Sequence, residues 1–326
     1  MPIGNRINYW RRLVGAYLLP GRSQLTFWHG RPEVNTEAEP GRLGQYYMKF
    51  EGKADYPGPY DTAGIPQLDY RGKVGVQYNP IAVAQYGLGN YNLYSRSADP
   101  TRKEKFLLAA DWLVDNLEVS PAGTHVWNHH FDWEYRDLLL DPWYSALAQG
   151  QGMSLLVRAH AETGNQRYAA AAAEAFETFC VSVDNGGVVY SDEAGGTWFE
   201  ETIVDPPTHI LNGFMWAAWG VYDYSLHTGD DRSGKLWQDA VDTLLANLEL
   251  FDTGYWSLYE QSGKRMSMLT SSFYHSLHIV QLRVMHLLTG ETVFLECAER
   301  WAGYSGSLVN RRRAFAHKAV FKLLYY

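Results

Sequence analysis

The feature that most constrains this chain is an apolar segment that recurs with a period of about 60–70 residues. Three such segments end in a Thr-Gly pair, at Gly164, Gly229 and Gly290, which are 65 and 61 residues apart. Each segment is long enough for a helix of roughly four to six turns. A glycine directly after a helix suits a left-handed C-cap. The pattern therefore predicts a helical repeat.

A second, more amphipathic helix is predicted after each of these segments, and an earlier copy of the pair precedes them. The first helix of that earlier copy is predicted at 78–94, and the four second helices are predicted at 101–117, 167–180, 234–250 and 292–304. Gly, Trp and Tyr residues between the pairs favour short β-hairpins, at 118–135, 184–199 and 251–263.

A repeat of this period, with helix pairs joined by hairpins, is typical of a closed helical toroid. We predict a mainly α fold, an (α/α) barrel or toroid of about four helix pairs, over residues 76–310. Residues 1–75 are rich in Gly, Pro and aromatic residues and are predicted to form an N-terminal arm with short strands. Residues 311–326 are predicted to be a basic and aromatic tail that packs on the toroid.

The composition argues against several classes of protein. The net charge of −8 argues against a general nucleic-acid binder, since those proteins usually have a basic surface. The two cysteines, Cys180 and Cys297, lie in apolar helical patterns and predict no disulfide framework. Neither a signal peptide nor a membrane-spanning run is evident, so a cytoplasmic protein is expected. The basic and aromatic start, residues 1–20, allows at most peripheral membrane contact.

The candidate site centres on Glu200 and Glu201, two adjacent acids in a loop flanked by Gly and Pro. The following Pro206-Pro207 pair can open a helix, because proline lacks an N–H where a helix start needs none. We therefore expect both acids beside a helix N-terminus, where they can meet a ligand. Two solvated loop acids are the alternative interpretation.

Further reactive groups are expected on the same face of the repeat. Tyr259 lies in the next hairpin, Tyr274 starts the fourth inner helix, and Lys264 and Arg265 lie between them. Acids, phenols and cations together suit the removal of a weakly acidic proton from a carbon next to a carboxylate. A phenol on the opposite face of that carbon would invert it.

Polar residues also occur near the starts of the apolar inner helices. A buried polar side chain is unfavourable unless it is hydrogen-bonded, so these residues either join neighbouring repeats or bind a ligand. The candidates are Gln85, Tyr86, Gln149, Asn212, His275 and His278.

Other catalytic signatures are missing from the sequence. His129-His130 lies in a predicted hairpin, where alternate side chains point apart, and His275 and His278 are not part of an HExxH motif. We therefore predict no metal site. The chain also has no P-loop, no dinucleotide glycine fingerprint and no GxSxG elbow.

Several segments resemble the D-glucuronyl C5-epimerases, the heparosan and heparan-sulfate glucuronate 5-epimerases. The similar segments begin at Asn79, Trp143 and Ile210, and are followed by Asp252-Thr253-Gly254 with Tyr259, by Tyr274-His275 and by Glu299-Arg300-Trp301. They run in order from about Tyr78 to Tyr304. The resemblance covers the C-terminal catalytic domain of that family, which is an (α/α) barrel.

The resemblance implies inversion at C5 of a glucuronate unit within a polysaccharide, which gives iduronate without an organic cofactor. By position, Glu201 would be one acid/base group, Tyr274 would act from the opposite ring face, and Tyr259 would assist by hydrogen bonding. Tyr144 would join the substrate-binding residues. The family's Tyr after the Glu pair is Thr202 here, and its Arg after the hairpin Tyr is Ser262, so Lys264 or Arg265 would supply that charge.

Three alternatives stay open. A uronate lyase would begin with the same proton abstraction and then eliminate the C4 substituent. A hydrolase would pair Glu200 or Glu201 with another acid, such as Asp132 or Asp205. A non-catalytic toroid would only bind glycans. In each case the expected partner is a glucuronate-containing polysaccharide or oligosaccharide, and the aromatic N-terminal arm is compatible with a homodimer.

Overall fold

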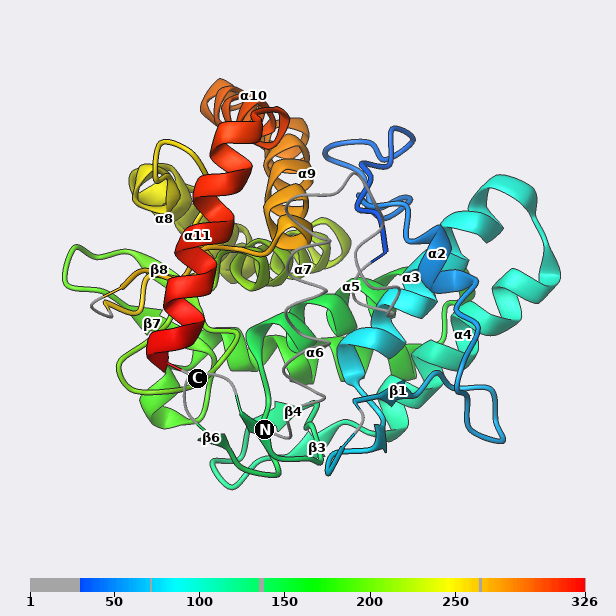
Figure 1. Cartoon of the computed structure of the whole chain (residues 1–326). Coiled ribbons are helices and arrows are strands. Elements are labelled where there is room, and N and C mark those ends of the chain that lie inside the picture. The colour runs from blue at the N-terminus through cyan, green and yellow to red at the C-terminus, as the bar shows by residue number, and fades with distance from the viewer. Residues whose placement is uncertain (1–29, 71, 135–137, 264–265, 326) are drawn as a thin grey trace.

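The fold is mainly α-helical, and its helices follow one another in pairs (Figure 1). The computed structural model describes residues 30–70, 72–134, 138–263 and 266–325. Four helix pairs form the body of this described part: α3 (Pro80–Ser97) with α4 (Pro100–Asp115), α5 (Ala146–Thr163) with α6 (Gln166–Phe176), α7 (Leu211–Thr228) with α8 (Asp231–Asn247), and α9 (Ser272–Thr289) with α10 (Thr292–Gly306).

Local sequence explains where these helices begin and end. The Asn79 side chain accepts hydrogen bonds from the amides of Ile81 and Ala82, and Pro80 opens α3 directly after it. The first helix of each later pair ends at one of the three glycines, Gly164, Gly229 and Gly290, whose φ angles are 70°, 67° and 76°. The predicted left-handed C-caps are therefore confirmed. Single 3-10 turns extend α6 and α8, at η2 (Glu177–Cys180) and η4 (Leu248–Phe251), and η3 (Val183–Asn185) follows η2.

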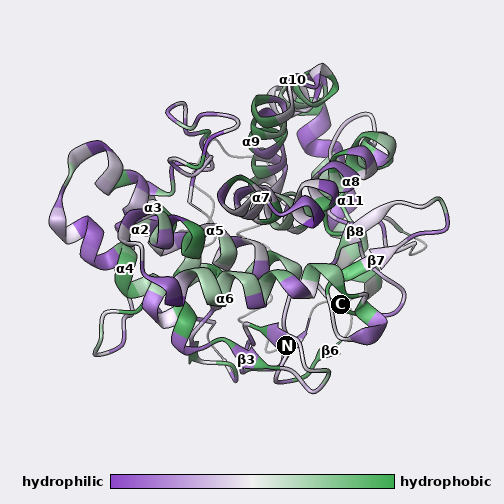
Figure 2. Ribbon diagram, turned by 180° about the vertical axis from the view of Figure 1, so that it is seen from behind, coloured by the Kyte–Doolittle hydropathy of each residue, from purple (hydrophilic) through white to green (hydrophobic). Residues whose placement is uncertain are grey.

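The first helix of each pair lies inside and the second outside. The inner helices pack in the order α3, α5, α7, α9. Helices α5 and α7 approach closely because Gly220 has no side chain. A Cβ on Gly220 would lie only 2.2 Å from the Gly150 carbonyl oxygen. From behind, the outer helix α4 shows a mixture of hydrophilic and hydrophobic residues (Figure 2), as expected for a helix with one solvated side. Closure of the ring stays a prediction.

Short antiparallel hairpins connect the pairs. They are β3 (Glu118–Val119) with β4 (His125–Val126), β5 (Trp133–Glu134) with β6 (Leu138–Leu139), and β7 (Val189–Ser191) with β8 (Thr197–Phe199). The third predicted hairpin, at 251–263, has only isolated antiparallel bridges: Asp252 with Ser257 inside the predicted range, and Leu258 with Leu269 beyond it. A fourth hairpin joins β1 (Leu68–Asp69) to β2 (Val76–Gln77) before α3.

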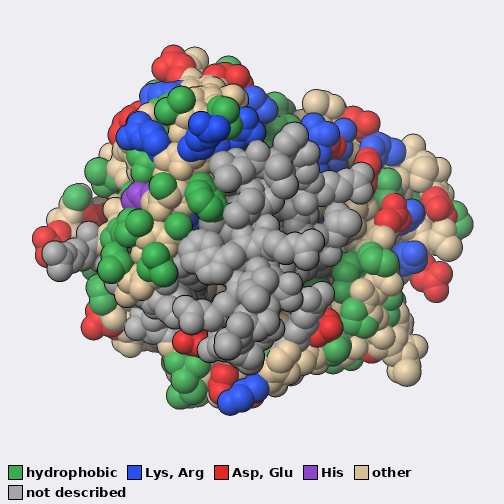
Figure 3. All heavy atoms as spheres, in the orientation of Figure 1, with side chains coloured by type: hydrophobic (Ala, Val, Ile, Leu, Met, Phe, Trp, Pro, Cys, Tyr) green, Lys and Arg blue, Asp and Glu red, His purple; other side chains and the backbone are tan. Residues whose placement is uncertain are grey.

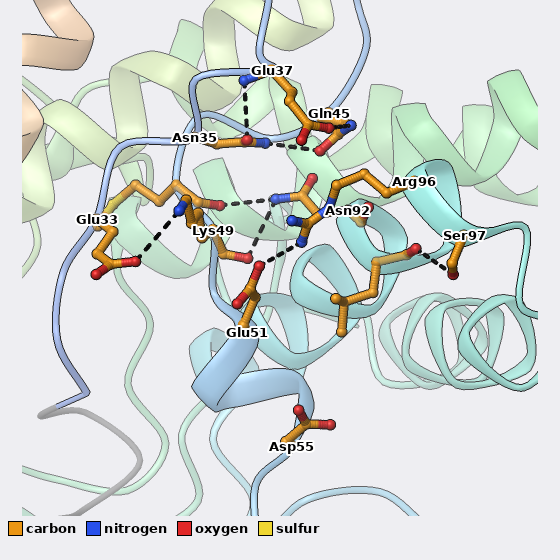
Figure 4. Close-up of polar contacts among 12 residues, drawn as sticks. Glu33, Asn35, Glu37, Gln45, Lys49, Glu51, Asp55, Asn92, Arg96 and Ser97 are labelled. Carbon is orange, nitrogen blue, oxygen red and sulfur yellow. Dashed lines mark hydrogen bonds and ion pairs between the residues drawn. The ribbon is translucent and has the colours of Figure 1, made fainter.

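The described part of the N-terminal arm packs into the helical body. Asn92 of α3 accepts from the Tyr46 amide at 2.7 Å and donates to the Met48 carbonyl at 2.9 Å. Arg96 of the same helix pairs with Glu51 of the short helix α2 (Glu51–Ala54) at 2.7 Å (Figure 4). These contacts fix the arm along α3.

A fully buried ion pair lies beneath the arm. Both Arg158 of α5 and Asp223 of α7 are 0% exposed, and Arg158 Nη1 lies 2.7 Å from Asp223 Oδ2. The Tyr47 hydroxyl donates to the other carboxylate oxygen at 2.5 Å, and Arg158 Nε donates to the Gly44 carbonyl at 2.8 Å. Because every charged group has partners, this pair joins the arm to two inner helices without an unsatisfied charge.

The C-terminal segment predicted as a tail is a helix, α11 (Leu308–Tyr325). It packs on the loop between α8 and α9, where the Tyr255 hydroxyl lies 2.9 Å from His317 Nδ1 and Lys318 donates to the Leu269 carbonyl at 2.6 Å. Arg312 and Arg313 are exposed on its first turns. Figure 3 shows Lys and Arg side chains gathered in the upper part of this face, where the first turns of α11 lie in Figure 1. Among the described residues, no helix combines the length and the apolar character needed to cross a bilayer.

Candidate active site

The loop after β8 begins at Glu200, whose backbone is held by two elements. Its amide donates to the Val188 carbonyl at 2.9 Å, and its carbonyl accepts from the amide of Ala146, the first residue of α5, also at 2.9 Å. These bonds place the Glu200-Glu201 pair beside the N-terminal end of an inner helix. The side chains of the two acids then take different directions.

The Glu200 carboxylate is buried, at 1% exposure, and is bound by the end of its own loop. His209 Nδ1 lies 2.5 Å from Glu200 Oε1, and the amides of His209 and Thr208 donate to Oε2 at 3.1 and 3.3 Å. The His209 ring stacks on Trp198 with 4.3 Å between ring centroids. Glu200 therefore anchors the loop and supplies a buried negative charge.

Glu201 packs against the first turn of α7. Asn212 Nδ2 donates to Glu201 Oε2 at 3.3 Å. Gly213 leaves the space that the carboxylate occupies, because a Cβ there would lie 2.1 Å from Oε2. Glu201 keeps partial solvent exposure. Burial, and secondarily the charge of Glu200, raise its pKa to about 8, although the Asn212 hydrogen bond acts in the opposite direction.

Helix α7 begins at Leu211, four positions after Pro207, so the prediction that the Pro206-Pro207 pair opens this helix is wrong. The intervening chain is irregular, and His209 has a left-handed φ of 48°. No side chain caps α7; instead its Leu211 amide donates to the Tyr259 carbonyl at 3.2 Å. The loop that carries Tyr259 thereby replaces the usual cap.

Tyr259 and Tyr274 lie in contact beside Glu201. Their rings form a T-shaped pair with 5.0 Å between centroids and 72° between planes. Tyr274 is the third residue of α9, and its amide donates to the Ser271 N-cap at 3.3 Å. Burial and the nearby charge of Glu201 raise the pKa of Tyr274, and a hydrogen bond from Tyr259 lowers it. The structure thus brings together the three residues predicted to be catalytic.

This arrangement offers a carboxyl group and two phenols at one place. A pKa near 8 leaves Glu201 able both to hold and to release a proton close to neutral pH, which suits an acid/base group. The Tyr274 phenol, with its raised pKa, is a proton donor in its resting state. Groups with shifted pKa values that face each other are typical of proton-transfer sites.

Four residues that were predicted to bind a ligand are fully buried in the core. Gln85, Gln149, His275 and His278 are all 0% exposed. Gln85 Nε2 donates to Gln151 at 2.9 Å, and Gln149 accepts from the Trp127 amide at 2.9 Å.

The two histidines join α9 to the loop before it and to α10. His275 Nδ1 lies 2.8 Å from Ser257 Oγ and its Nε2 lies 3.0 Å from the Trp301 carbonyl. His278 Nδ1 lies 3.3 Å from the same hydroxyl. Like Gln85 and Gln149, both histidines therefore have structural hydrogen bonds within the core.

The other predicted binding residues have varied positions. Tyr86 is 2% exposed and packs edge-on against Tyr60, whereas Tyr144 is partly exposed just before Ser145, which caps α5. Asn212 contacts Glu201, as described above. Lys264 and Arg265 lie outside the described residues.

At the two positions where the chain departs from the family that it resembles, the side chains make local hydrogen bonds. Thr202 Oγ1 lies 2.9 Å from Thr208 Oγ1 and closes the loop after the Glu pair. Ser262 donates to Glu260 at 2.5 Å. The motif residue Asp252 is also structural, because its Oδ2 accepts from Arg300 Nε at 2.7 Å and from Trp301 Nε1 at 2.9 Å.

His209 is a site residue to which no sequence pattern points. Its partner Glu200 is nine positions earlier, and the contact depends on the left-handed turn at His209 itself. A histidine after a Pro pair was the only available signal, and it has no specificity.

No metal cluster is formed by the residues that the structure describes: none of their His, Cys, Asp and Glu side chains come together in a group of three or more suited to an ion. His129 is fully buried and stacks on Trp143 at 3.9 Å. Burial lowers its pKa to about 3, so its ring is neutral at physiological pH.

Comparison with known protein families identifies the group to which this chain is related. Residues 121–303, more than half of the chain, match the family described as the D-glucuronyl C5-epimerase C-terminus. The chain belongs to this family. The match begins after α4 and extends into α10, so it includes Glu201, Tyr259 and Tyr274.

Two relatives and one solved structure illustrate the similarity. A D-glucuronyl C5-epimerase of Caenorhabditis elegans is 32% identical over 216 residues, which are 61% of this chain and 35% of that protein. The chain thus spans about a third of the length of this relative. An uncharacterized protein from Methanocaldococcus jannaschii is 25% identical over 245 residues, which are 70% of this chain and 78% of that protein.

An α-1,6-mannanase, GH76A of Salegentibacter sp. HEL1_6, has a related fold, with a TM-score of 0.50 and 11% identity over 78% of this chain and 68% of that one. At this identity the likeness concerns the fold alone.

Proposed function

We propose that this protein is a cofactor-independent C5-epimerase that converts D-glucuronate to L-iduronate units within a polysaccharide. Membership in the epimerase family supports the substrate class. The observation that carries the mechanism is that Glu201 and Tyr274 lie close enough to interact. The charge of Glu201 raises the pKa of Tyr274, and the ring centroids of Tyr259 and Tyr274 are 5.0 Å apart.

The proposed reaction uses one base and one acid on opposite faces of the sugar ring. The Glu201 carboxylate takes the C5 proton, and the electron pair of the C–H bond moves into the adjacent carboxylate as an enolate-like dianion. Tyr274 then donates its phenolic proton to the other face of C5. The centre is inverted, Glu201 is protonated and Tyr274 is a tyrosinate, and exchange of both protons with water resets the site.

The neighbouring residues tune these two groups. Tyr259 donates a hydrogen bond that lowers the pKa of Tyr274 and so stabilises the tyrosinate formed in the reaction. Glu200 raises the pKa of Glu201 through its charge, which makes the ionised Glu201 a stronger base. Lys264 and Arg265, in the loop after Tyr259, are the cations that we propose for the substrate carboxylate.

Incubation with desulfated heparosan in D₂O, followed by NMR at the uronate C5 position, tests this proposal. We expect deuterium at C5, new iduronate signals and unchanged chain length. A shorter chain with a UV-absorbing double bond would identify a lyase instead, and new reducing ends without a double bond would identify a hydrolase. Glycan binding with neither deuterium uptake nor cleavage of the chain would refute catalysis altogether.

The role of Glu201 is tested by comparison with its neighbour. Glu201→Gln removes the proposed base and keeps the Asn212 contact, so C5 exchange should disappear. Asp205→Asn changes an exposed acid in the same loop and should retain the wild-type rate. Equal activity of the two variants would exclude Glu201 as the base.

A further inference from the structure

Gln281 lies on the same helix as Tyr274 and is 0% exposed. The two residues are seven positions apart on α9, which is close to two helical turns, so their side chains leave the helix on the same side. That side faces α7, because Gln281 Nε2 donates to the backbone carbonyl of Asn212 at 2.9 Å. Gln281 thus links the helix that carries Tyr274 to the first turn of α7.

The same first turn of α7 holds Glu201. Asn212, whose backbone carbonyl is bound by Gln281, uses its side-chain Nδ2 to donate to Glu201 Oε2 at 3.3 Å. Gln281 therefore reaches Glu201 through a single intermediate residue. Glu201 is held by α7 and Tyr274 belongs to α9, so the Gln281–Asn212 bond spans the two helices that carry the reacting groups.

We propose that Gln281 is a positioning residue that sets the separation of Glu201 and Tyr274. The proposal rests on the epimerase function argued above, in which two groups act on opposite faces of one carbon. Such a reaction is sensitive to misplacement, and an error of about 1 Å in a reacting group can reduce the rate about 100-fold.

Stability does not account for Gln281. Among the described residues, Gln281 Oε1 and Asn212 Oδ1 are buried oxygens that have no hydrogen-bond partner. A buried amide oxygen without a donor is unfavourable, and a methionine of similar length would fill the same volume without it. We therefore expect Gln281→Met to fold as well as the wild type, which separates the positioning role from a structural one.

Gln151 of α5 provides a matched control. It is also 0% exposed, and its Oε1 accepts from Gln85 of α3 at 2.9 Å. Gln151→Met thus removes a buried glutamine hydrogen bond between two other inner helices.

The experiment measures two quantities in both variants: the kcat and KM of C5 deuterium exchange, and the pKa of Glu201 from a ¹³C NMR titration of protein labelled at the glutamate δ-carbon. The Glu201 signal is assigned by its loss in Glu201→Gln. For Gln281→Met we expect kcat to fall between about 10- and 100-fold, with KM within about twofold of the wild type. The pKa of Glu201 should rise, because the Asn212 hydrogen bond that lowers it is loosened. Gln151→Met should change neither quantity.

Wild-type values of both quantities in Gln281→Met would overturn the proposal, as would equal changes in the two variants. If the wild-type protein exchanges no C5 hydrogen on any glucuronate polymer, the proposed function is wrong. The titration then still decides whether Gln281 holds Glu201, so the two failures are distinguishable.

Discussion

A single methyl group at Gly213 should displace the proposed base. In the structure a Cβ at this position would lie 2.1 Å from Glu201 Oε2, 2.7 Å from its Cβ and 2.8 Å from its Cδ. Ordinary contact begins at 3.4 Å, so the Glu201 carboxylate must move by about 1.3 Å in Gly213→Ala. A displacement of this size predicts a loss of about 100-fold in kcat.

The fold should survive the same substitution, because alanine is favoured over glycine within a helix by about 1 kcal/mol. Gly303→Ala is the control, since Gly303 is exposed on α10 and a Cβ there has no neighbour within 4 Å. The assay is C5 deuterium exchange with heparosan, together with thermal unfolding of each variant. Full activity of Gly213→Ala would show that Glu201 does not act from the position beside α7, and the proposed mechanism would then be wrong.

Further outcomes follow from the same structure. Tyr274→Phe should reduce inversion at C5 by about 100- to 10,000-fold, measured as iduronate formed, while circular dichroism remains that of the wild type; undiminished inversion would exclude Tyr274 as the acid. Because burial raises the pKa of Glu201 from 4.5 to about 8, the folded protein holds a proton between these pH values that the unfolded chain has released. The free energy of unfolding should therefore fall as pH rises through this range. The Tm of Glu201→Gln minus the Tm of the wild type should increase from pH 5 to pH 8.5, and a constant difference would contradict the pKa shift. Asp223→Ala leaves Arg158 charged and buried without its partner, so urea unfolding should show a loss of about 3–5 kcal/mol, and a loss below about 1 kcal/mol would contradict the account of this pair.

The limits of sequence reasoning are visible in the polar residues of the inner helices. Gln149 and Asn212 both lie near the start of an apolar helix and look alike in sequence. In the structure Gln149 binds the Trp127 amide within the core, whereas Asn212 binds Glu201. A polar residue on a buried helix gives the same pattern whether its partner lies in the core or is a proposed catalytic group. The sequence could therefore propose both as ligand-binding residues but could not separate them.

The helix pairs, the glycine C-caps and two hairpins, β3–β4 and β7–β8, were determined by the sequence itself, because apolar periodicity and capping residues act between positions only a few residues apart. The left-handed glycines at the ends of α5, α7 and α9 are of this kind. The site was decided by tertiary structure: Glu201 fits against Gly213, the Tyr259 carbonyl binds the first amide of α7, and Gln281 reaches Asn212 from another helix. These contacts join residues from about ten to seventy positions apart, and such separations leave no periodic pattern in a chain. Only the packing of α7 against α9 brings these groups together.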